Sequence, residues 1–405
     1  MKCINLYLSF KWNKELSLFI ALLIMSLFYN YQHVFQQGPY SIHMWRQTDC
    51  LAITQGYYQD NANLLEPSMS YQVGGTGRCV SEFPLFYYIN AQVWKLVGKS
   101  EFLFRLFTFS IVMIGLLFLY WLIRAVLKSH FWAMGLTLFV FTSPVFVFYA
   151  NSFMGNVPAV SMVFIAWYFF YKFHSDSSHD TYLIGCALII LLVGLIRISL
   201  LYTFSFIYLI YVIELFTSYR FGIDRKLFER KIKQVVILAT PILIILSWVV
   251  YATHYNTINH SEGLFLVNLR PIWVMERADL LETTRMLFYY NNLPTLLFSF
   301  VGVLLFIGCS AFLLYHVNKL NKIVQLILYS LFIGCSLYVL FFYASFRVHD
   351  YYYLELIPLL FAVFGVFVYT IKMNWPVVYM SRNFKIGFLL FLLLSSVYCA
   401  AKHRI

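Results

Sequence analysis

The sequence predicts an all-α polytopic membrane protein with about 11 transmembrane helices and one long polar loop after the first of them. Of its 405 residues, 61% are hydrophobic and only 11% are charged, whereas soluble domains carry about 25% charged residues. The mean hydropathy is +0.75. Apolar stretches of about 20 residues, the length that a helix needs to cross a bilayer, recur along the chain. These observations exclude a soluble globular protein.

The apolar stretches divide the chain into spans with short connections. The first stretch can span a bilayer and lacks a small-residue cleavage site, so we expect a permanent helix rather than a signal peptide. Arg197 interrupts a long apolar run at a tight hairpin, where it would either cap a turn at the surface or face a site inside the bundle. We expect residues 1–405 to form one transmembrane domain without a soluble C-terminal domain. The predicted spans are 16–35, 103–127, 131–149, 156–173, 181–196, 199–217, 232–252, 294–315, 324–343, 353–371 and 384–401.

Lysine and arginine residues favour a cytoplasmic N-terminus, because these residues concentrate on the inner side of membrane proteins. This orientation places 17 of the 29 basic residues inside. The loops 36–102 and 253–293, the connections 150–155 and 344–352 and the C-terminus then lie outside. The formal charge of +12 is spread over short connections, which indicates contact with anionic lipid and not with nucleic acid. We therefore expect an integral plasma (inner) membrane protein with its active site on the outer face.

The loop 36–102 is where chemistry in water would take place, since it holds five of the 17 acidic residues. Thr48 can cap a helix that runs to about Tyr58, and Asp49 would then occupy its first turn, where the helix dipole keeps a carboxylate ionised. The spacing of apolar residues over 84–97 predicts a second helix in the membrane interface, with Trp94 at the level of the lipid headgroups.

Two cysteines of this loop, Cys50 and Cys79, could form a disulfide if the loop is extracytoplasmic, but the sequence does not give the distance between them. Four further cysteines lie in apolar segments and are interpreted as small hydrophobic residues: Cys186, Cys309, Cys335 and Cys399. The sequence contains no zinc-binding spacing of His and Cys, no Walker loop, no Rossmann fingerprint and no Gly-x-Ser-x-Gly motif. No cofactor is assigned, and a divalent metal ion stays possible.

Acidic and basic residues on the outer side are the candidates for a site. Asp49 lies three residues after Arg46, and Glu82 opens the second helix of the loop; Arg46 could instead pair with Glu82 and hold the loop shut. Glu355 enters a span together with Pro358, which indicates a cavity wall. Arginine binds phosphate oxygens in pairs, so basic residues on one face predict an anion site. The candidates for that site are Arg46, Arg78, Arg105, Arg347 and His349.

The order of these features resembles the GT-C glycosyltransferases, and in particular the branch of protein O-mannosyltransferases and lipid A aminoarabinose transferases. The resemblance covers roughly residues 10–370. It departs from the family pattern where Cys50 follows Asp49 in place of a second acid, and where Asn151 or Asn156 replaces an acid of the second outer connection. The matching stretches are Trp45-Arg46-Gln47-Thr48-Asp49, Glu82-Phe83-Pro84-Leu85 with Tyr87-Tyr88, Arg105, and His349-Asp350-Tyr351-Tyr352-Tyr353-Leu354 with Pro358.

The resemblance implies a membrane glycosyltransferase that moves a sugar from a polyprenyl-phosphate carrier to an outer glycolipid, polysaccharide or protein. We expect inversion at the sugar, with Asp49 as the general base and Glu82 as the reserve catalytic residue. The expected substrate-binding residues are Trp45, Arg46, Arg78, Arg105, Arg347, His349, Tyr351, Tyr352 and Glu355. The alternative is a flippase or polymerase of lipid-linked glycans, or a transporter, although the paired repeats of many transporters are not evident.

Overall fold

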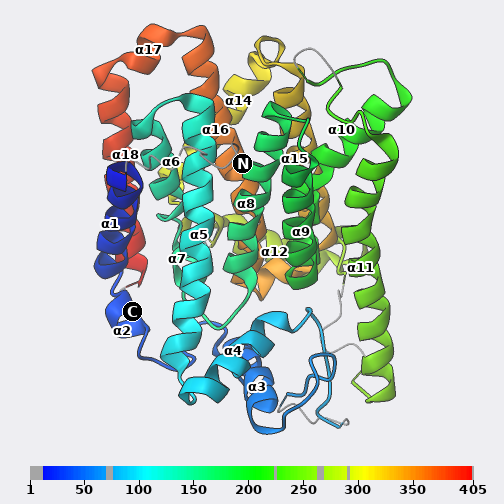
Figure 1. Ribbon diagram of the computed structural model, residues 1–405. Helices are drawn as coiled ribbons and strands as arrows, with labels where there is room; N and C mark the ends of the chain where they lie inside the picture. The colour runs from blue at the N-terminus through cyan, green and yellow to red at the C-terminus, as the bar shows by residue number, and fades with distance from the viewer. Residues whose placement is uncertain (1–11, 70–75, 223–225, 262–268, 290–291, 404–405) are drawn as a thin grey trace.

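The computed structural model is a bundle of long helices that stand side by side, with the 36–102 loop packed against one end (Figure 1). The structure describes residues 12–69, 76–222, 226–261, 269–289 and 292–403. Within these residues no β-strand forms, and one isolated antiparallel bridge joins Ser68 to Arg78. The predicted all-α class is therefore confirmed for the described part of the chain.

Each predicted apolar span contains helix. Among the described residues, six helices are long and apolar enough to cross a membrane, and three shorter apolar helices accompany them. The number of membrane crossings stays a prediction. The bundle helices are α1 (Trp12–Phe28), α5 (Glu101–Leu127), α6 (His130–Val140), α7 (Pro144–Tyr149), α8 (Asn156–Ser175), α9 (Asp180–Ile196), α10 (Ser205–Phe216), α11 (Lys231–Ile258), α14 (Phe300–Tyr315), α15 (Lys322–Phe341), α16 (Ile357–Asn374) and α18 (Arg382–His403).

Five predicted spans are not continuous α-helices. The span 16–35 contains α1 and α2 (Tyr31–Val34), and the span 294–315 contains α13 (Asn292–Leu297) and α14. The span 131–149 breaks into α6 and α7 because Pro144, at the start of α7, cannot continue the preceding helix. The spans predicted at 199–217 and 353–371 begin as the tighter helices η1 (Ile198–Phe204) and η6 (Asp350–Leu356). A further tight turn, η5 (Tyr343–Arg347), precedes η6. Residues of these turns lie at the end of the bundle that carries the 36–102 loop.

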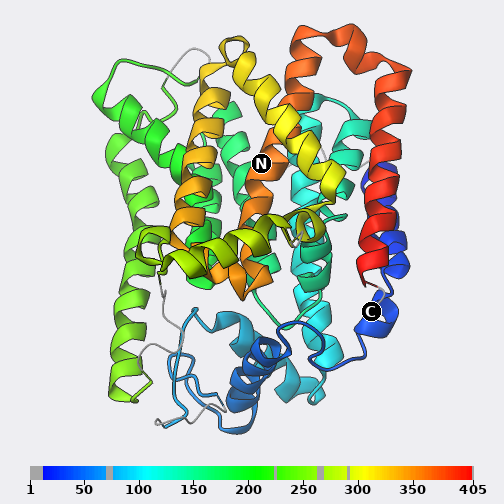
Figure 2. The ribbon, with the colours of Figure 1, turned by 180° about the vertical axis from the view of Figure 1, so that it is seen from behind.

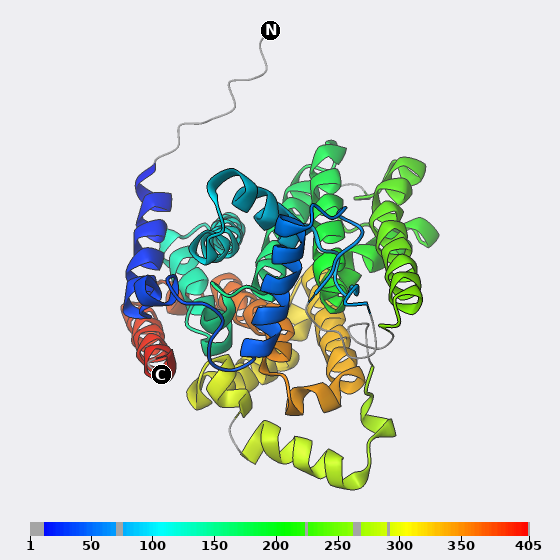
Figure 3. The ribbon, with the colours of Figure 1, turned by 90° about the horizontal axis from the view of Figure 1, so that it is seen from below.

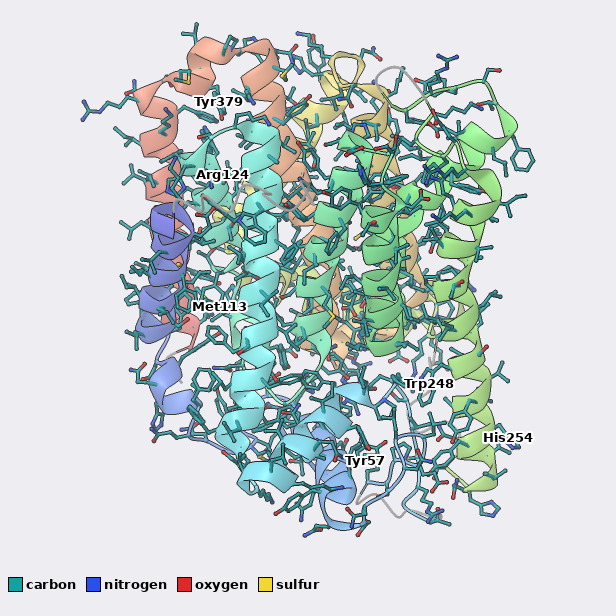
Figure 4. The ribbon with its side chains drawn as sticks, in the orientation of Figure 1. Tyr57, Met113, Arg124, Trp248, His254 and Tyr379 are labelled. Atoms are coloured by element: carbon teal, nitrogen blue, oxygen red, sulfur yellow. The ribbon has the colours of Figure 1, made fainter. Side chains whose placement is uncertain are left out.

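The core of the bundle is built by close contact of α5 with α8. A Cβ atom on Gly115 of α5 would lie 2.5 Å from the Cβ of Ser161 on α8, so only glycine allows this approach. Leu116, Val163 and Phe164 are fully buried around the contact. Figure 4 shows Arg124 and Tyr379 at one end of the bundle, and Tyr57, Trp248 and His254 at the other.

The end of the bundle away from the 36–102 loop is closed by ion pairs. Asp180 accepts from Lys233 at 2.8 Å and from Arg230 and Gln234 at 3.0 Å. Arg124 of α5 pairs with Glu15 of α1 at 2.8 Å. Two short elements, η4 (Val317–Lys319) and α17 (Pro376–Met380), connect helices at this end.

The 36–102 loop follows α2 (Tyr31–Val34) and contains α3 (Met44–Gln59) and α4 (Leu85–Val97). Seen from below, α3 crosses the ends of the bundle helices (Figure 3). The prediction that Thr48 caps this helix is wrong, because α3 already begins at Met44 and Asp49 lies in its second turn.

The helix α4 forms over nearly the predicted range, but its buried face differs from the prediction. Trp94 is buried and its indole N–H donates to the Ser100 carbonyl at 2.8 Å, so it does not lie among headgroups. Leu96 and Val97 are the exposed apolar residues at the end of this helix.

The C-terminal half of α11 holds the 36–102 loop through side chains that bind its backbone. The Asn256 amide accepts from the Val80 N–H and donates to the Val80 carbonyl, both at 2.8 Å. Tyr251 donates to the Leu65 carbonyl at 2.6 Å. These bonds satisfy backbone groups that no regular secondary structure pairs.

The second long loop, which the sequence predicts to lie outside, contains η2 (Ile272–Val274), α12 (Arg277–Thr284) and the π-helical turn η3 (Arg285–Tyr289), and α13 (Asn292–Leu297) follows. Figure 2 shows this segment crossing in front of the bundle helices. Arg347 of η5 binds α12 of this segment through ion pairs with Asp279 at 2.8 Å and Glu282 at 3.1 Å.

Candidate active site

A cavity of about 950 Å³ opens between the 36–102 loop and the bundle. Its lining comes from the first loop, the start of α8, the junction of α9 with η1, the middle of α11, the second loop and residues 342–352. Its charged residues are Arg46, Asp49, Glu82, Arg197 and Arg270. An aliphatic wall from α9 and α11 includes Leu195, Ile196, Ile245, Val249 and Ala252.

Glu82 is held by a dense set of partners. Both of its carboxylate oxygens accept from Arg46, at 2.7 and 2.9 Å, and they also accept from the hydroxyls of Ser81 and Tyr87. Burial alone would raise the pKa of the Glu82 carboxyl, but Arg46 and the two hydroxyls outweigh it and lower the pKa to about 2. Glu82 is therefore a weak base that fixes the loop, as one of the two sequence interpretations expected.

Asp49 is the contrasting carboxylate of the cavity. It makes no hydrogen bond or ion pair with the described part of the chain, although Arg46 lies one helical turn before it. Partial burial raises the pKa of Asp49, Arg46 lowers it, Glu82 raises it again, and the net direction is upward. The expected stabilisation of the anion by the helix dipole is wrong, since Asp49 lies beyond the first turn.

Arg197 faces the cavity, which decides between the two sequence interpretations of this residue. Its guanidinium pairs with Glu355 and lies 4.8 Å from the centre of the Tyr352 ring. Glu355 also accepts from the Ser199 hydroxyl at 3.0 Å and is almost fully buried. Glu355 therefore lies behind the cavity wall and orients Arg197.

His349 lines the cavity as a neutral imidazole. Burial and the nearby His43 and Arg197 lower its pKa to about 4. This corrects the expectation that His349 contributes a positive charge. The neighbouring Asp350 accepts from the Tyr149 hydroxyl at 2.6 Å and lies 3.1 Å from the His43 ring nitrogen.

Three predicted phosphate ligands lie outside the cavity lining. Arg105 is fully buried and donates to the carbonyls of Gln37 at 2.9 Å, Gly38 at 2.8 Å and Asn151 at 2.7 Å. Arg347 is engaged by the two acids of α12. Arg78 is exposed at the edge of the first loop. The placement of these arginines in one cavity is therefore wrong, whereas Arg46 and His349 do line it.

Arg270 and Trp248 line the cavity but were not selected from the sequence. Arg270 has no ion-pair partner among the described residues, and its position in the loop 253–293 is the one signal that the sequence offers. Trp248 lies in the middle of an apolar helix, and its indole N–H donates to the Ser81 carbonyl at 3.3 Å. Nothing in the local sequence distinguishes it from a membrane-facing tryptophan.

The loop cysteines Cys50 and Cys79 are both buried thiols and form no disulfide. The Cys50 sulfur lies 3.1 Å from the Tyr87 hydroxyl, beside the Glu82 network. Burial raises the pKa of Cys50 to about 12 and that of Cys79 to about 11. Within the described ranges, no group of three or more His, Cys, Asp and Glu side chains is arranged to hold a metal ion.

A scan against protein-family models and a search of curated proteins both find no match. Among solved structures, the chain is similar to ArnT from Cupriavidus metallidurans bound to undecaprenyl phosphate, with a TM-score of 0.53 and 12% identity. This similarity covers 96% of the present chain and 74% of ArnT. The Archaeoglobus fulgidus oligosaccharyltransferase, in complex with Zn and sulfate, has a TM-score of 0.47 and 13% identity over 94% of this chain and 52% of its own. The similarity to ArnT, together with the long apolar helices, shows an integral membrane protein with the GT-C fold.

Proposed function

We propose that this protein is a membrane glycosyltransferase that moves a sugar from a polyprenyl-phosphate carrier to an extracytoplasmic acceptor. One observation carries the proposal: a single cavity combines an unpartnered carboxylate, guanidinium groups and an aliphatic wall. These are the groups that would accept a proton, bind a phosphate and bind a prenyl chain. Undecaprenyl phosphate bound to ArnT, which shares the fold, supports a lipid-phosphate donor.

The donor phosphate would bind to the guanidinium groups of the cavity. Arg270 is the best placed, because Arg46 and Arg197 are already engaged by Glu82 and Glu355. The planar fork of arginine matches the oxygens of a phosphate. The prenyl chain would lie against the aliphatic wall of α9 and α11, where burial of its CH₂ groups contributes about 0.8 kcal/mol each.

Asp49 would be the general base. As the acceptor oxygen forms a bond to the anomeric carbon, the bond from that carbon to the phosphate oxygen breaks and its electron pair leaves with the phosphate. The leaving phosphate is an anion and needs no proton, so one carboxylate that takes the acceptor proton is sufficient. A single displacement of this kind inverts the anomeric configuration. The raised pKa of Asp49 makes it a stronger base than Glu82.

The cavity would face the outer side of the plasma membrane. The basic residues favour this orientation, and the cavity lining includes residues from both long loops predicted to lie outside. Reporter fusions at residues 75 and 275 test it. We expect both to be active only outside the cytoplasm, and cytoplasmic activity at either position would reverse the orientation.

The decisive experiment uses the full chain in nanodiscs with a radiolabelled polyprenyl-phosphate sugar and an extract of cell-envelope glycans, lipids and proteins. We expect label to move from the lipid to an acceptor, and the new linkage to have the opposite anomeric configuration. A parallel assay in proteoliposomes measures whether labelled lipid crosses the bilayer. Crossing without any transfer would favour the flippase or transporter alternative and contradict the proposal.

A further inference from the structure

One wall of the cavity is aromatic. We call Trp45, His349, Tyr351 and Tyr352 the aromatic wall; all four line the cavity. The His349 ring lies 5.7 Å from the Tyr352 ring at an angle of 22° and 5.2 Å from the Tyr351 ring. Trp45 extends the wall, with its ring centre 6.0 Å from that of His349. Trp45 comes from α3, His349 from the segment that joins η5 to η6, and Tyr351 and Tyr352 from η6 itself.

Trp45 is the outermost part of this wall, with 51% of its surface exposed. An exposed tryptophan in a cavity gains most by covering its ring with a ligand, because aromatic side chains bury large apolar areas. The hydroxyls of Tyr351 and Tyr352 make no hydrogen bond with the described part of the chain. The wall therefore combines flat apolar surfaces with polar groups that have no protein partner.

The aromatic wall is also next to the proposed base. Trp45 and Asp49 are four residues apart on α3, so their side chains share one face of this helix, and both line the cavity. A molecule that lies on the Trp45 ring would extend toward the Asp49 carboxylate. The aliphatic wall, in contrast, comes from α9 and α11.

The chemistry of the wall selects among acceptor classes. A sugar ring has C–H faces that pack on aromatic rings and hydroxyls at its rim that bind polar groups. A cationic acceptor would also suit aromatic rings, but Arg270, which lines the cavity and has no ion-pair partner among the described residues, repels it. A polypeptide can also lie against aromatic rings, and the transfer assay distinguishes it from a saccharide.

We infer that the acceptor is a saccharide, whose ring lies on Trp45 and whose hydroxyl points to Asp49. This inference rests on the proposed glycosyltransferase function and adds the acceptor class to it. The reaction then joins two sugars: the acceptor hydroxyl oxygen bonds to the donor anomeric carbon, Asp49 takes the hydroxyl proton, and the polyprenyl phosphate leaves with the electron pair of the broken bond.

The test measures saccharide binding without any donor. Saturation-transfer NMR on the full chain in nanodiscs uses methyl β-D-glucopyranoside, methyl α-D-mannopyranoside and cellobiose as probes, with sorbitol as an acyclic control. We expect at least one pyranoside to bind through its ring C–H protons and sorbitol not to bind. Trp45→Ala should weaken this binding about tenfold, while Trp45→Phe should retain most of it.

The matched control is Trp273→Ala, since Trp273 is an exposed tryptophan of the second loop outside the cavity lining. This variant should bind the pyranoside as the unaltered protein does. If no pyranoside binds, or if Trp45→Ala binds as well as Trp273→Ala, the saccharide acceptor is wrong.

The transfer assay separates the two proposals. Label that moves to a peptide or lipid but to no saccharide would overturn the acceptor class and leave the glycosyltransferase proposal standing. Pyranoside binding that depends on Trp45, without transfer from any polyprenyl-phosphate sugar, would overturn the glycosyltransferase proposal.

Discussion

Carboxylates at the two ends of the bundle differ in how their oxygens are engaged. At the end away from the cavity, Asp180 binds three side chains and Glu15 binds Arg124. At the cavity, Glu82 is equally engaged, but Asp49 has no partner in the described part of the chain. These structural acids are thus satisfied by cations and by hydroxyl or amide donors. A partly buried acid without such partners is then the one available to a substrate.

The largest effect is expected when Asp49 loses its charge. Asp49→Asn should reduce sugar transfer about 10²- to 10⁴-fold, the usual contribution of a general base, while donor binding and folding persist. The control is Asp176→Asn, an exposed acid at the opposite end of the bundle, which should leave transfer unchanged. Near-normal turnover of Asp49→Asn would remove the base assignment.

Glu82 should matter for stability instead. Glu82→Gln removes the carboxylate charge that the largely buried Arg46 binds, which should lower the free energy of unfolding by about 3–5 kcal/mol. Glu15→Gln, which breaks the more exposed pair with Arg124, should cost less than about 1 kcal/mol. Thermal unfolding in detergent measures both. If both variants lost the same free energy of unfolding, the ion pairs at the two ends of the bundle would not differ as described.

Acid should destabilise the cavity end through the same residue. The folded-state pKa of Glu82 is about 2, below the usual 4.5, so its contribution is fully present above about pH 4.5 and is lost as the pH falls toward 2. The difference of about 2.5 pKa units corresponds to about 3 kcal/mol. Unfolding measured from pH 6 to pH 2 should therefore show a steeper decline for the unaltered protein than for Glu82→Gln. Parallel curves would contradict the lowered pKa.

Two arginines, Arg270 and Arg347, differ in the same way as the carboxylates. Arg270→Ala should weaken binding of the polyprenyl-phosphate donor by about 1.5–3 kcal/mol, since a charge-assisted contact is lost. Arg347→Ala should leave donor affinity unchanged, because its guanidinium is engaged by Asp279 and Glu282. Donor affinity measured by scintillation proximity distinguishes them. If only Arg347→Ala lost donor affinity, the phosphate would bind at Arg347, as the sequence predicted, and not at Arg270.

The sequence predicted the helical segments because apolar length decides them. The sequence could not show which groups each arginine side chain binds, because tertiary contacts decide the position of its guanidinium group. Arg105 and Arg270 are both arginines of the predicted outer side, yet the carbonyls of Gln37, Gly38 and Asn151 converge only on Arg105. Local spacing also could not show that Arg46 binds Glu82, which lies 36 residues away, in preference to Asp49.

The residue preferences of helix N-caps predict the wrong start for α3. Threonine is a favoured helix cap, so Thr48 was the natural choice. The helix instead starts after His43, which has the left-handed φ of 55° that few residues other than glycine adopt. His43 is held there by its contact with Asp350, more than 300 residues later in the sequence. A contact so distant in the chain is invisible to any rule based on neighbours.

The two hydrogen bonds between Asn256 and the backbone of Val80 can form only late in biosynthesis. The 36–102 loop is translated early, but its backbone partners Asn256 and Tyr251 belong to a helix that leaves the ribosome much later. These hydrogen bonds therefore cannot form, and the backbone groups of the loop bind water, until α11 has been made. Contacts between residues so far apart in the sequence form slowly, because the conformational entropy of the chain between them must be lost first. During that interval the loop depends on its own contacts, such as those of Glu82 with Arg46 and Tyr87.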